Sequence, residues 1–306
     1  MKARICVVMP TYNERGNLEP TLSGLFARNA GVDVLIVDDN SPDKTGDLAD
    51  VIARVTASAR DTVRSVALDD VSFRLKDVAR PSCELSIGSS GALSDANVST
   101  ADIAVANRLN SCTNGSRVFV LHRPAKSGLG SAYVDGFTWA LERGYDLICE
   151  MDMDGSHRPE DLNRMLQYME EHAGVDLVLG SRRVRGGRTE RWAWYRDWIS
   201  RMGSLYARTM LGLRVRDMTS GFRVYRAEVL RKVGLEEIAD NGYVFQIDMT
   251  RRVVGAGGIV VELPIVFPER EIGESKMNGA IVREAMVNVT RWGFERIGKR
   301  GSKKSK

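Results

Sequence analysis

Two aspartates with a single residue between them give the clearest chemical signal in this chain of 306 residues. They are Asp152 and Asp154, on either side of Met153, and they follow an apolar run at 146–151 that has the character of a strand. Side chains two positions apart in an extended segment point the same way, so both carboxylates could face one cation. The pattern indicates a site for Mg²⁺ or Mn²⁺, with diphosphate oxygens completing the coordination shell.

Two more polar clusters follow strand-like runs. Pro-Thr-Tyr-Asn-Glu occupies 10–14 after the first run, and Asp-Asp-Asn-Ser occupies 38–41 after the second. In open α/β sheets the ligand lies beyond the carboxyl ends of the strands. We therefore expect these clusters and the Asp152 segment to line one crevice.

Other kinds of catalytic site fit the sequence poorly. Gly128 and Gly130 open a helical segment after a strand, but Tyr133 stands where the dinucleotide-binding pattern requires a small residue, and the sequence contains no P-loop pattern. His157 is the only histidine near the acids, and we interpret it as a structural hydrogen-bonding residue rather than a catalyst. A serine or cysteine nucleophile would lack a plausible base.

The elements that position these clusters alternate along the chain. Helical apolar patterns separate strand-like runs at 5–9, 32–37, 117–121, 146–151 and 176–179. This alternation predicts an α/β fold in which helices flank a mostly parallel sheet of five strands.

The rhythm of strands and helices is interrupted at 56–115, a segment rich in Ser, Ala, Asp and Asn with Phe73 as its only aromatic residue. We predict one catalytic domain made of 1–55 and 116–296, with 56–115 as an insertion that is mostly disordered or loosely folded. Because residues 63–75 show some alternation, a small β-rich subdomain is the alternative. Residues 297–306 form a basic tail.

Composition narrows the class of protein. The chain is 43% apolar and 27% charged, with a net charge of +4, which is too small to indicate a nucleic-acid partner. Its four cysteines are far apart and suit a reducing cytosol better than a disulfide framework or a zinc site. The chain starts without signal-peptide character and has no apolar run of about eighteen residues, so we expect neither export nor a membrane span.

A membrane contact is nevertheless indicated near residue 200. Trp192, Trp194 and Trp198 stand beside an apolar helical pattern, and tryptophan favours the water–lipid interface; a packed core helix would fit the same pattern. Arg196 and Ser200 are four residues apart and therefore share one helical face. A second apolar stripe with basic flanks, Ile281, Val282, Ala285, Met286, Val289 and Trp292, predicts an amphipathic helix that could lie on the membrane.

Together with further motifs in the same order, these residues resemble the polyprenol-phosphate (dolichol-phosphate) mannose synthases. That family consists of inverting family 2 glycosyltransferases with the GT-A nucleotide-sugar fold. The resemblance covers nearly all of the chain outside 56–115 and the tail. The further motifs are 123–130 with Gly136 and Phe137, 152–160, 180–182, 219–223, 242–246, and Arg270 with 273–276.

The resemblance implies a role for each matching residue. Pro10, Tyr12, Glu14, Val37 and Asp39 would hold the guanine nucleotide of GDP-mannose. Asp152, Asp154 and the backbone of Met153 would hold Mg²⁺ or Mn²⁺, with Ser156 near the third ligand position. Positive charge around the phosphates would come from Arg182, Arg270 and Lys276, and the residues implied in catalysis are Asp152, Asp154 and Arg182. Met153 departs from the family, in which alanine is usual at this position.

The acceptor implied by the resemblance is a polyprenyl phosphate, held by Arg182, Arg196 and Ser200. The expected place of action is the cytoplasmic face of a membrane, reached by peripheral contact or through a membrane-anchored partner. Two alternatives stay open. One is a sibling enzyme that uses UDP-glucose or another nucleotide sugar. The other is a catalytically silent binding or scaffold subunit, which would be expected to lack one of the two aspartates.

Overall fold

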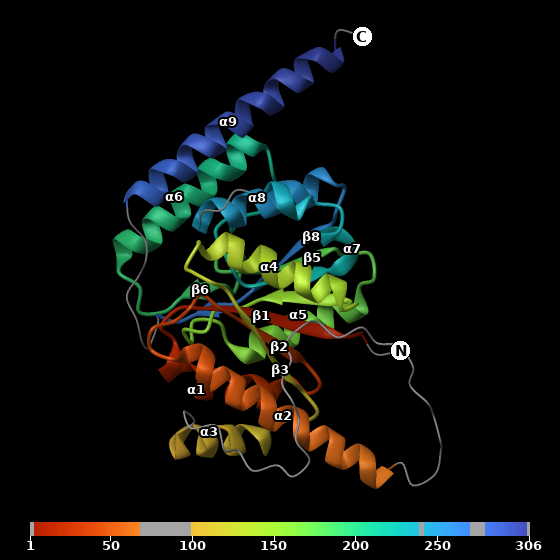
Figure 1. Ribbon diagram of the computed structural model, residues 1–306. Helices are drawn as coiled ribbons and strands as arrows, with labels where there is room; N and C mark the ends of the chain where they lie inside the picture. The colour runs from red at the N-terminus through yellow and green to blue at the C-terminus, as the bar shows by residue number, and fades with distance from the viewer. Residues whose placement is uncertain (1–2, 68–98, 239–241, 270–278, 305–306) are drawn as a thin grey trace.

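A mixed sheet of seven strands forms the centre of the computed structural model, which describes residues 3–67, 99–238, 242–269 and 279–304 (Figure 1). The strand order is β3-β2-β1-β4-β7-β5-β8, and only β7 runs antiparallel to its neighbours. The predicted mostly parallel sheet is therefore confirmed, but two of its strands, β7 and β8, were not predicted. The strands are β1 (Ile5–Thr11), β2 (Asp33–Asp38), β3 (Val118–His122), β4 (Leu147–Glu150), β5 (Leu177–Ser181), β7 (Arg223–Arg226) and β8 (Val260–Pro264).

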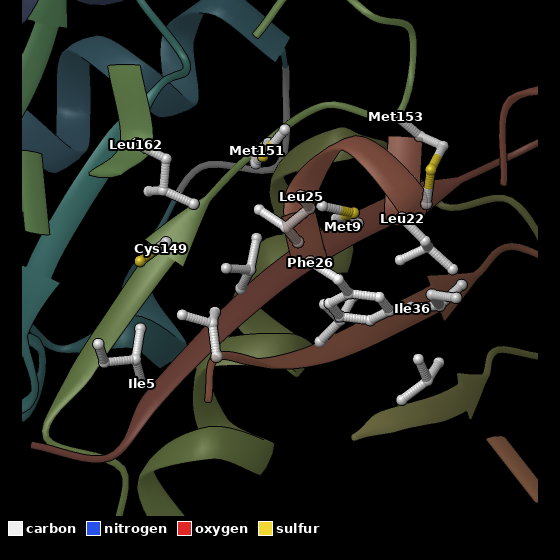
Figure 2. Close-up of a cluster of buried hydrophobic side chains, with 14 of the residues drawn as sticks. Ile5, Met9, Leu22, Leu25, Phe26, Ile36, Cys149, Met151, Met153 and Leu162 are labelled. Carbon is white, nitrogen blue, oxygen red and sulfur yellow. The ribbon is translucent and has the colours of Figure 1, made fainter. Parts of the chain in front are cut away.

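Helices cover both faces of this sheet. One face packs against α1 (Arg15–Arg28), α2 (Thr45–Ala67), α3 (Thr100–Asn110) and α5 (Pro159–Glu171). The other packs against α4 (Leu129–Glu142), α7 (Ala227–Leu230) and α8 (Gly242–Gly255), with the short 3₁₀ helix η1 (Leu235–Glu237) beside them. The periodicity of the sequence located the packed positions of α1 correctly: Figure 2 shows Leu22, Leu25 and Phe26 gathered around Met9 and Ile36 of the sheet.

Two further helices, α6 (Trp194–Leu211) and α9 (Gly279–Lys304), lie side by side away from the sheet (Figure 1). Ala207 of α6 and Val289 of α9 are buried with Ile247 of α8 in a third apolar cluster. The α6 helix ends at Gly212, which has a φ of 60°, and Arg296 of α9 donates a hydrogen bond to the carbonyl of Met210. The two helices therefore pack as one unit on α8.

A second, two-stranded sheet ties the chain before α6 to the chain after β8. It pairs β6 (Arg188–Thr189) with β9 (Val266–Phe267) in parallel. The start of α6 is thereby fixed beside the end of the main sheet.

The ends of the predicted insertion are ordered, which corrects the expectation for 56–115. Residues 56–67 continue α2, and α3 lies within the same span. Ala106 and Leu109 of α3 are buried in the core cluster that includes α1. The apolar residues of α3 are too few for the sequence pattern to predict this packing. Residues 68–98 lie outside the described part of the chain.

The C-terminal stripe also differs from the prediction. Val289 and Trp292 are buried against α6 and α8 rather than presented to a membrane, because they complete the third cluster. Ile281 and Val282 have side chains outside the described set. In the part of the chain that the structure describes, no helix is long and apolar enough to cross a bilayer.

Candidate active site

The polar clusters predicted to share one crevice do lie at one edge of the sheet. β1, β2, β4 and β5 run in the same direction, so the segments that follow them emerge at the same edge. β2 and β3 lie on one side of β1, and β4 lies on its other side. The boundary between β1 and β4 is therefore a topological switch point of the sheet. In doubly wound sheets this is where ligands bind.

The Asp152 segment bends instead of remaining extended. β4 ends at Glu150 and residues 153–155 form a bend, so the alternation of a strand does not set the two carboxylates, as the sequence argument assumed. Local hydrogen bonds set them instead. The Asp154 carboxylate accepts from the backbone N–H of Ser156 at 3.0 Å and from its hydroxyl. Asp154 is buried, at 4% exposure, and these hydrogen bonds hold its carboxylate in one orientation.

Three neighbouring side chains hold the rest of this bend. The backbone N–H of Asp152 donates to Nδ1 of His157 at 2.8 Å, which gives His157 the structural role expected from the sequence. The Tyr133 hydroxyl of α4 donates to the Asp152 carboxylate at 3.0 Å. The Thr21 hydroxyl of α1 donates to the carbonyl of Met153 at 3.1 Å. Helices from both faces of the sheet thus fix the backbone between the two aspartates.

The donor set suits a hard divalent cation. Carboxylates are preferred ligands of Mg²⁺ and Mn²⁺, and Mg²⁺ is commonly held by one or two carboxylates together with substrate phosphates. Among the described residues no group of three or more His, Cys, Asp or Glu is placed to hold a metal, so Asp152 and Asp154 fit a metal that is shared with a ligand. The Met153 side chain is buried in the core (Figure 2), which leaves only its backbone near the site.

The loop after β2 is organised around two buried aspartates. Asp38 accepts hydrogen bonds from the Thr11 hydroxyl at 3.1 Å and from the hydroxyl and N–H of Ser41. Asp39 pairs with Arg123. Burial raises the pKa of Asp39, although the Arg123 guanidinium acts in the opposite direction. The β1 and β2 loops are thus joined into one rigid wall of the crevice.

Arg123 is the first residue of the 123–130 motif, but no role was predicted for it from the sequence. Its guanidinium donates to Asp135 at 2.8 Å and to Ser131 at 2.7 Å, both on α4, besides its contact with Asp39. It therefore locks the β2 loop onto α4. Nearby, Lys126 places its ammonium 3.9 Å from the centre of the Tyr12 ring.

The remaining residues implied in nucleotide binding are placed unevenly. Pro10 and Tyr12 are partly exposed on the β1 segment. The backbone N–H of Glu14 donates to the Thr45 hydroxyl at 3.0 Å, which fixes the start of α1. Val37 is fully buried in the cluster beneath α4, so the structure places it in the core rather than on the surface of the crevice. Arg270 and Lys276 lie outside the described residues.

Arg182, at the end of β5, is held by an aspartate that was not predicted. Asp217 accepts from the backbone N–H of Arg182 at 2.9 Å, from Nε at 2.8 Å and from the terminal nitrogen Nη2 at 2.7 Å. Burial acts to raise the pKa of Asp217, but the charge and hydrogen bonds of Arg182 outweigh it and lower that pKa. Arg182 is thus a fixed cation whose orientation is set by a fully buried partner.

A second arginine converges on the same place. The Arg196 guanidinium lies 4.1 Å from the centre of the Trp192 ring, and the Arg182 guanidinium lies 5.5 Å from that centre. Arg182 also donates to the Thr219 hydroxyl at 3.0 Å, and that hydroxyl is 3.4 Å from the Ser200 hydroxyl. The Arg196 Nε and the Trp192 Nε1 are buried and make no hydrogen bond. Two cations and unsatisfied donors suit an anionic ligand.

This cationic cluster closes one end of an apolar groove between α6 and α9. Arg182, Trp192, Ser200 and Thr219 line that end. The rest of the groove is lined by aliphatic and aromatic residues of α6, α8 and α9, namely Ile199, Gly203, Tyr206, Ala207, Ile247, Ala285, Met286 and Val289. The lining of the groove therefore combines a cation with an apolar surface, the two features that an anionic head joined to an apolar chain would contact.

The outer surface of the same two helices is unusually apolar. Nine of the twelve exposed large hydrophobic side chains in the described part of the chain belong to α6 and α9. Trp194 is 80% exposed and Phe294 is 65% exposed. Of the two readings left open by the sequence, a packed core helix and an interfacial one, the exposed tryptophans favour the interfacial one. The exposed residues are Trp194, Tyr195, Trp198, Met202 and Leu205 of α6 and Met286, Val287, Phe294 and Ile297 of α9.

Edge-on ring contacts connect the Asp152 bend to the groove. The His157 ring packs edge-on against Phe267 of β9, with centroids 5.4 Å apart, and Phe267 packs edge-on against Trp192 at 5.5 Å. Arg182 lies 5.2 Å from the Phe267 ring centre. The acidic bend and the cationic cluster are therefore adjacent parts of one site.

A buried carboxyl lies directly beneath this site. Glu150, the last residue of β4, is fully buried and accepts hydrogen bonds from the Tyr225 hydroxyl at 2.7 Å and from the Gln246 amide at 2.8 Å. Burial raises the pKa of Glu150 to about 7, even though the charge of Arg223 acts to lower it. No local pattern marks Glu150 as a functional residue, because its hydrogen-bond partners come from β7 and α8.

Comparison with known proteins agrees with this geometry. The family model described as glycosyl transferase family 2 matches residues 6–66 and 95–234, and so skips most of the segment that the structure does not describe. The chain is 44% identical to the undecaprenyl-phosphate mannosyltransferase of Micrococcus luteus, over 95% of this chain and 94% of that protein. It is 40% identical to the polyprenol monophosphomannose synthase of Mycolicibacterium smegmatis, over 95% and 87% respectively.

Solved structures give the same architecture at low sequence identity. Glucosyl-3-phosphoglycerate synthase of Mycobacterium tuberculosis, in a complex with Mn²⁺, UDP-glucose and phosphoglyceric acid, aligns with a TM-score of 0.58 and 14% identity, covering 95% of this chain and 80% of that one. At this identity the likeness bears on the fold alone.

Proposed function

This chain belongs to glycosyl transferase family 2 and has the GT-A fold, and we propose that it transfers mannose from GDP-mannose to a polyprenyl phosphate. The observation that carries the proposal is the groove between α6 and α9, whose apolar walls end at Arg182, Trp192, Ser200 and Thr219. A polyprenyl phosphate has the matching form, because it joins one anionic head to a long hydrocarbon chain.

The donor would bind across the carboxyl ends of β1, β2 and β4. Tyr12 offers a ring to the base, and the Asp39 loop, locked by Arg123, offers a polar edge to the sugar. Asp152 and Asp154 would hold Mg²⁺ or Mn²⁺ against the diphosphate, with Ser156 orienting Asp154. Such a metal, when bound, neutralises the negative charge that develops on the leaving diphosphate.

Chemistry at the acceptor end needs no protein base. The phosphate oxygen of the acceptor is already ionised near neutral pH, so it can attack the anomeric carbon of mannose directly. The bond to the acceptor oxygen forms as the bond to the diphosphate oxygen breaks on the opposite side, which inverts the anomeric configuration. Arg182 and Arg196 hold the attacking phosphate by charge, and Asp217 prevents Arg182 from reorienting.

The exposed faces of α6 and α9 would rest on the cytoplasmic surface of a membrane. Their tryptophan and phenylalanine side chains suit that interface, and the groove between the helices would open to the lipid that supplies the acceptor. Peripheral contact, alone or with a membrane-anchored partner, would then deliver the acceptor chain sideways into the groove.

The test is an assay of the purified protein with labelled GDP-mannose, Mg²⁺ or Mn²⁺ and polyprenyl phosphate, run beside UDP-glucose. Formation of a labelled, lipid-extractable product from GDP-mannose supports the proposal. Transfer from UDP-glucose instead would keep the acceptor site and replace the donor. Donor binding without transfer to any polyprenyl phosphate would refute the proposed reaction.

A further inference from the structure

A second pocket, separate from the groove, lies on the outer side of α6. Arg183, Arg201, Leu205, Arg208 and Arg216 line it, and we refer to it as the arginine pocket. It shares no lining residue with the groove described above. Its volume of about 370 Å³ falls within the range of about 300–1,000 Å³ that is typical of small-ligand sites.

Charge in the arginine pocket is strongly unbalanced. Among the described residues, Asp197 pairs with Arg183 and accepts from the Nε of Arg201 at 2.6 Å, and Glu262 accepts from the backbone N–H of Arg216 at 2.7 Å. Within the same described set, no carboxylate lies within the 4.0 Å ion-pair limit of the guanidinium of Arg208 or Arg216. Four guanidinium groups therefore line the pocket, and within the described residues two of them, those of Arg208 and Arg216, have no carboxylate partner, which favours binding of an anion.

Arg183 supplies an independent sign of a missing anion. Its side chain is 6% exposed, and its Nε and Nη2 make no hydrogen bond. A buried donor left without an acceptor costs about 1–3 kcal/mol, and more when the group is charged. Burial also lowers the pKa of Arg183, which shows how poorly its charge is solvated. An anion in the pocket would satisfy these donors.

The position of the pocket on α6 indicates what carries the anion. Arg201, Leu205 and Arg208 follow one another at spacings of four and three, and Trp194 and Trp198 continue the same stripe toward the start of the helix. Trp198 is 58% exposed and Leu205 is 49% exposed. The arginine pocket therefore opens on the apolar face of α6, where a bilayer surface would present phosphates beside hydrocarbon.

We propose that the arginine pocket binds the phosphate of an anionic phospholipid headgroup and thereby fixes the depth and rotation of α6 at the membrane surface. The inference rests on the proposed membrane contact of α6 and α9 but not on mannosyl transfer. It concerns bulk lipid rather than the polyprenyl acceptor, because the two pockets lie on different faces of α6.

Vesicle binding tests the proposal without any acceptor or donor present. The full-length protein is sedimented with vesicles of phosphatidylglycerol and phosphatidylcholine or of phosphatidylcholine alone. Wild type should bind the anionic vesicles more tightly. The double variant Arg208→Gln with Arg216→Gln should lose about 30-fold in partition coefficient, the effect expected of two arginines near an anionic surface.

The matched control removes the same charge elsewhere. Arg231→Gln with Lys232→Gln changes two exposed residues after α7, which Figure 1 shows well apart from α6. This control should bind nearly as wild type, because screening limits such charges to about 8–10 Å in physiological salt. If it loses as much binding as the double variant, general charge explains the effect and the pocket is not a site.

Two further measurements make the result decisive. An unchanged melting temperature and circular dichroism spectrum show that the double variant is folded. If the double variant is unstable, the single exposed change Arg216→Gln should still cost about fivefold in vesicle binding. Calorimetric titration with inorganic phosphate covers the other source of the anion. Equal vesicle binding by wild type and variant, whether or not phosphate affinity depends on the two arginines, would overturn the lipid assignment.

Discussion

Replacing Arg196 by alanine should weaken use of the lipid acceptor while leaving donor binding intact. The Arg196 side chain is 14% exposed and is held by the Trp192 ring and by Glu269 at 3.3 Å, so its charge is poorly screened and already oriented. A charge-assisted contact of this kind contributes about 1.5–3 kcal/mol. At about 1.36 kcal/mol per tenfold, kcat/KM for polyprenyl phosphate should fall by about 10- to 150-fold.

The cost to stability should be smaller than the cost to activity. Alanine removes the cation–π contact with Trp192, worth about 0.5–1 kcal/mol, and leaves Glu269 without its partner. Glu269 is 45% exposed and can be hydrated, so no buried charge is stranded. The variant should therefore fold and melt within a few degrees of wild type.

The assay compares two titrations on one preparation. Initial rates are measured against polyprenyl phosphate concentration at saturating GDP-mannose, and GDP-mannose binding is measured by calorimetry with Mg²⁺. Arg188→Ala is the control, because it removes the same charge from β6, where Arg188 is 59% exposed and paired with Glu190. If donor affinity falls as much as acceptor use, Arg196 belongs to the donor site or to the fold, and the acceptor assignment is wrong.

Three other predictions follow from the same geometry. Asp154→Asn should abolish most turnover in a folded protein, as should EDTA added to wild type; full activity of the variant in EDTA would contradict a shared metal. The pKa of Glu150 is about 7 in the folded state and about 4.5 in the unfolded state. Between these pH values the folded state binds more protons than the unfolded state, so the free energy of unfolding falls as the pH rises through this range. The fall should be roughly 3 kcal/mol, and thermal melting of Glu150→Gln from pH 5 to 8 should show a flatter pH dependence than wild type. Replacing residues 68–98 with a Gly/Ser linker should preserve GDP-mannose binding by calorimetry, whereas a deletion that extends through Leu109 should unfold part of the core.

Periodicity predicted the elements that are regular and locally encoded. The apolar spacing of Leu18, Leu22 and Leu25 is that of a helix with one buried face, and the strand-like runs of β1 and β2 are fully or nearly fully buried. The order of strands and helices was then sufficient to bring the 10–14, 38–41 and 152–154 clusters to one edge. Local pattern and chain order carried this part of the prediction.

Of the two unpredicted strands, β7 lacks that local signal, whereas β8 contains a short apolar run, Val-Val-Glu-Leu-Pro, that was not assigned as a strand. β7 has the sequence Arg-Val-Tyr-Arg, and its first arginine, Arg223, is completely buried. Hydropathy marks such a segment as surface, although inside the protein Arg223 donates from Nε to the Ser220 carbonyl at 2.7 Å and from Nη1 to the Tyr225 hydroxyl at 3.2 Å. Only long-range pairing with β4 and β5 makes this segment a strand, and that pairing is invisible in the sequence.

The supporting residues of the site escaped prediction for the same reason. Asp217 and Arg123 act through partners 35 and 84 residues away, so no spacing rule connects them to Arg182 or Asp39. The sequence does contain one feature that could have indicated a role for Asp217, because this acid stands two residues before the 219–223 motif. Their roles depend on which strand ends become neighbours, which is decided by the strand order of the sheet.

The arrangement of rings between the two halves of the site gives the fold a further role. Phe267 contacts His157, which supports the Asp152 bend, and also contacts Trp192, which supports Arg196. Phe267 is placed by the two-residue pairing of β9 with β6, and β6 precedes α6. The ring contacts therefore form a continuous path from the start of α6 through Trp192 and Phe267 to the acidic bend. The small second sheet thus does more than close a loop, because its strands hold the acidic bend and the cationic cluster, the proposed donor and acceptor ends, beside each other.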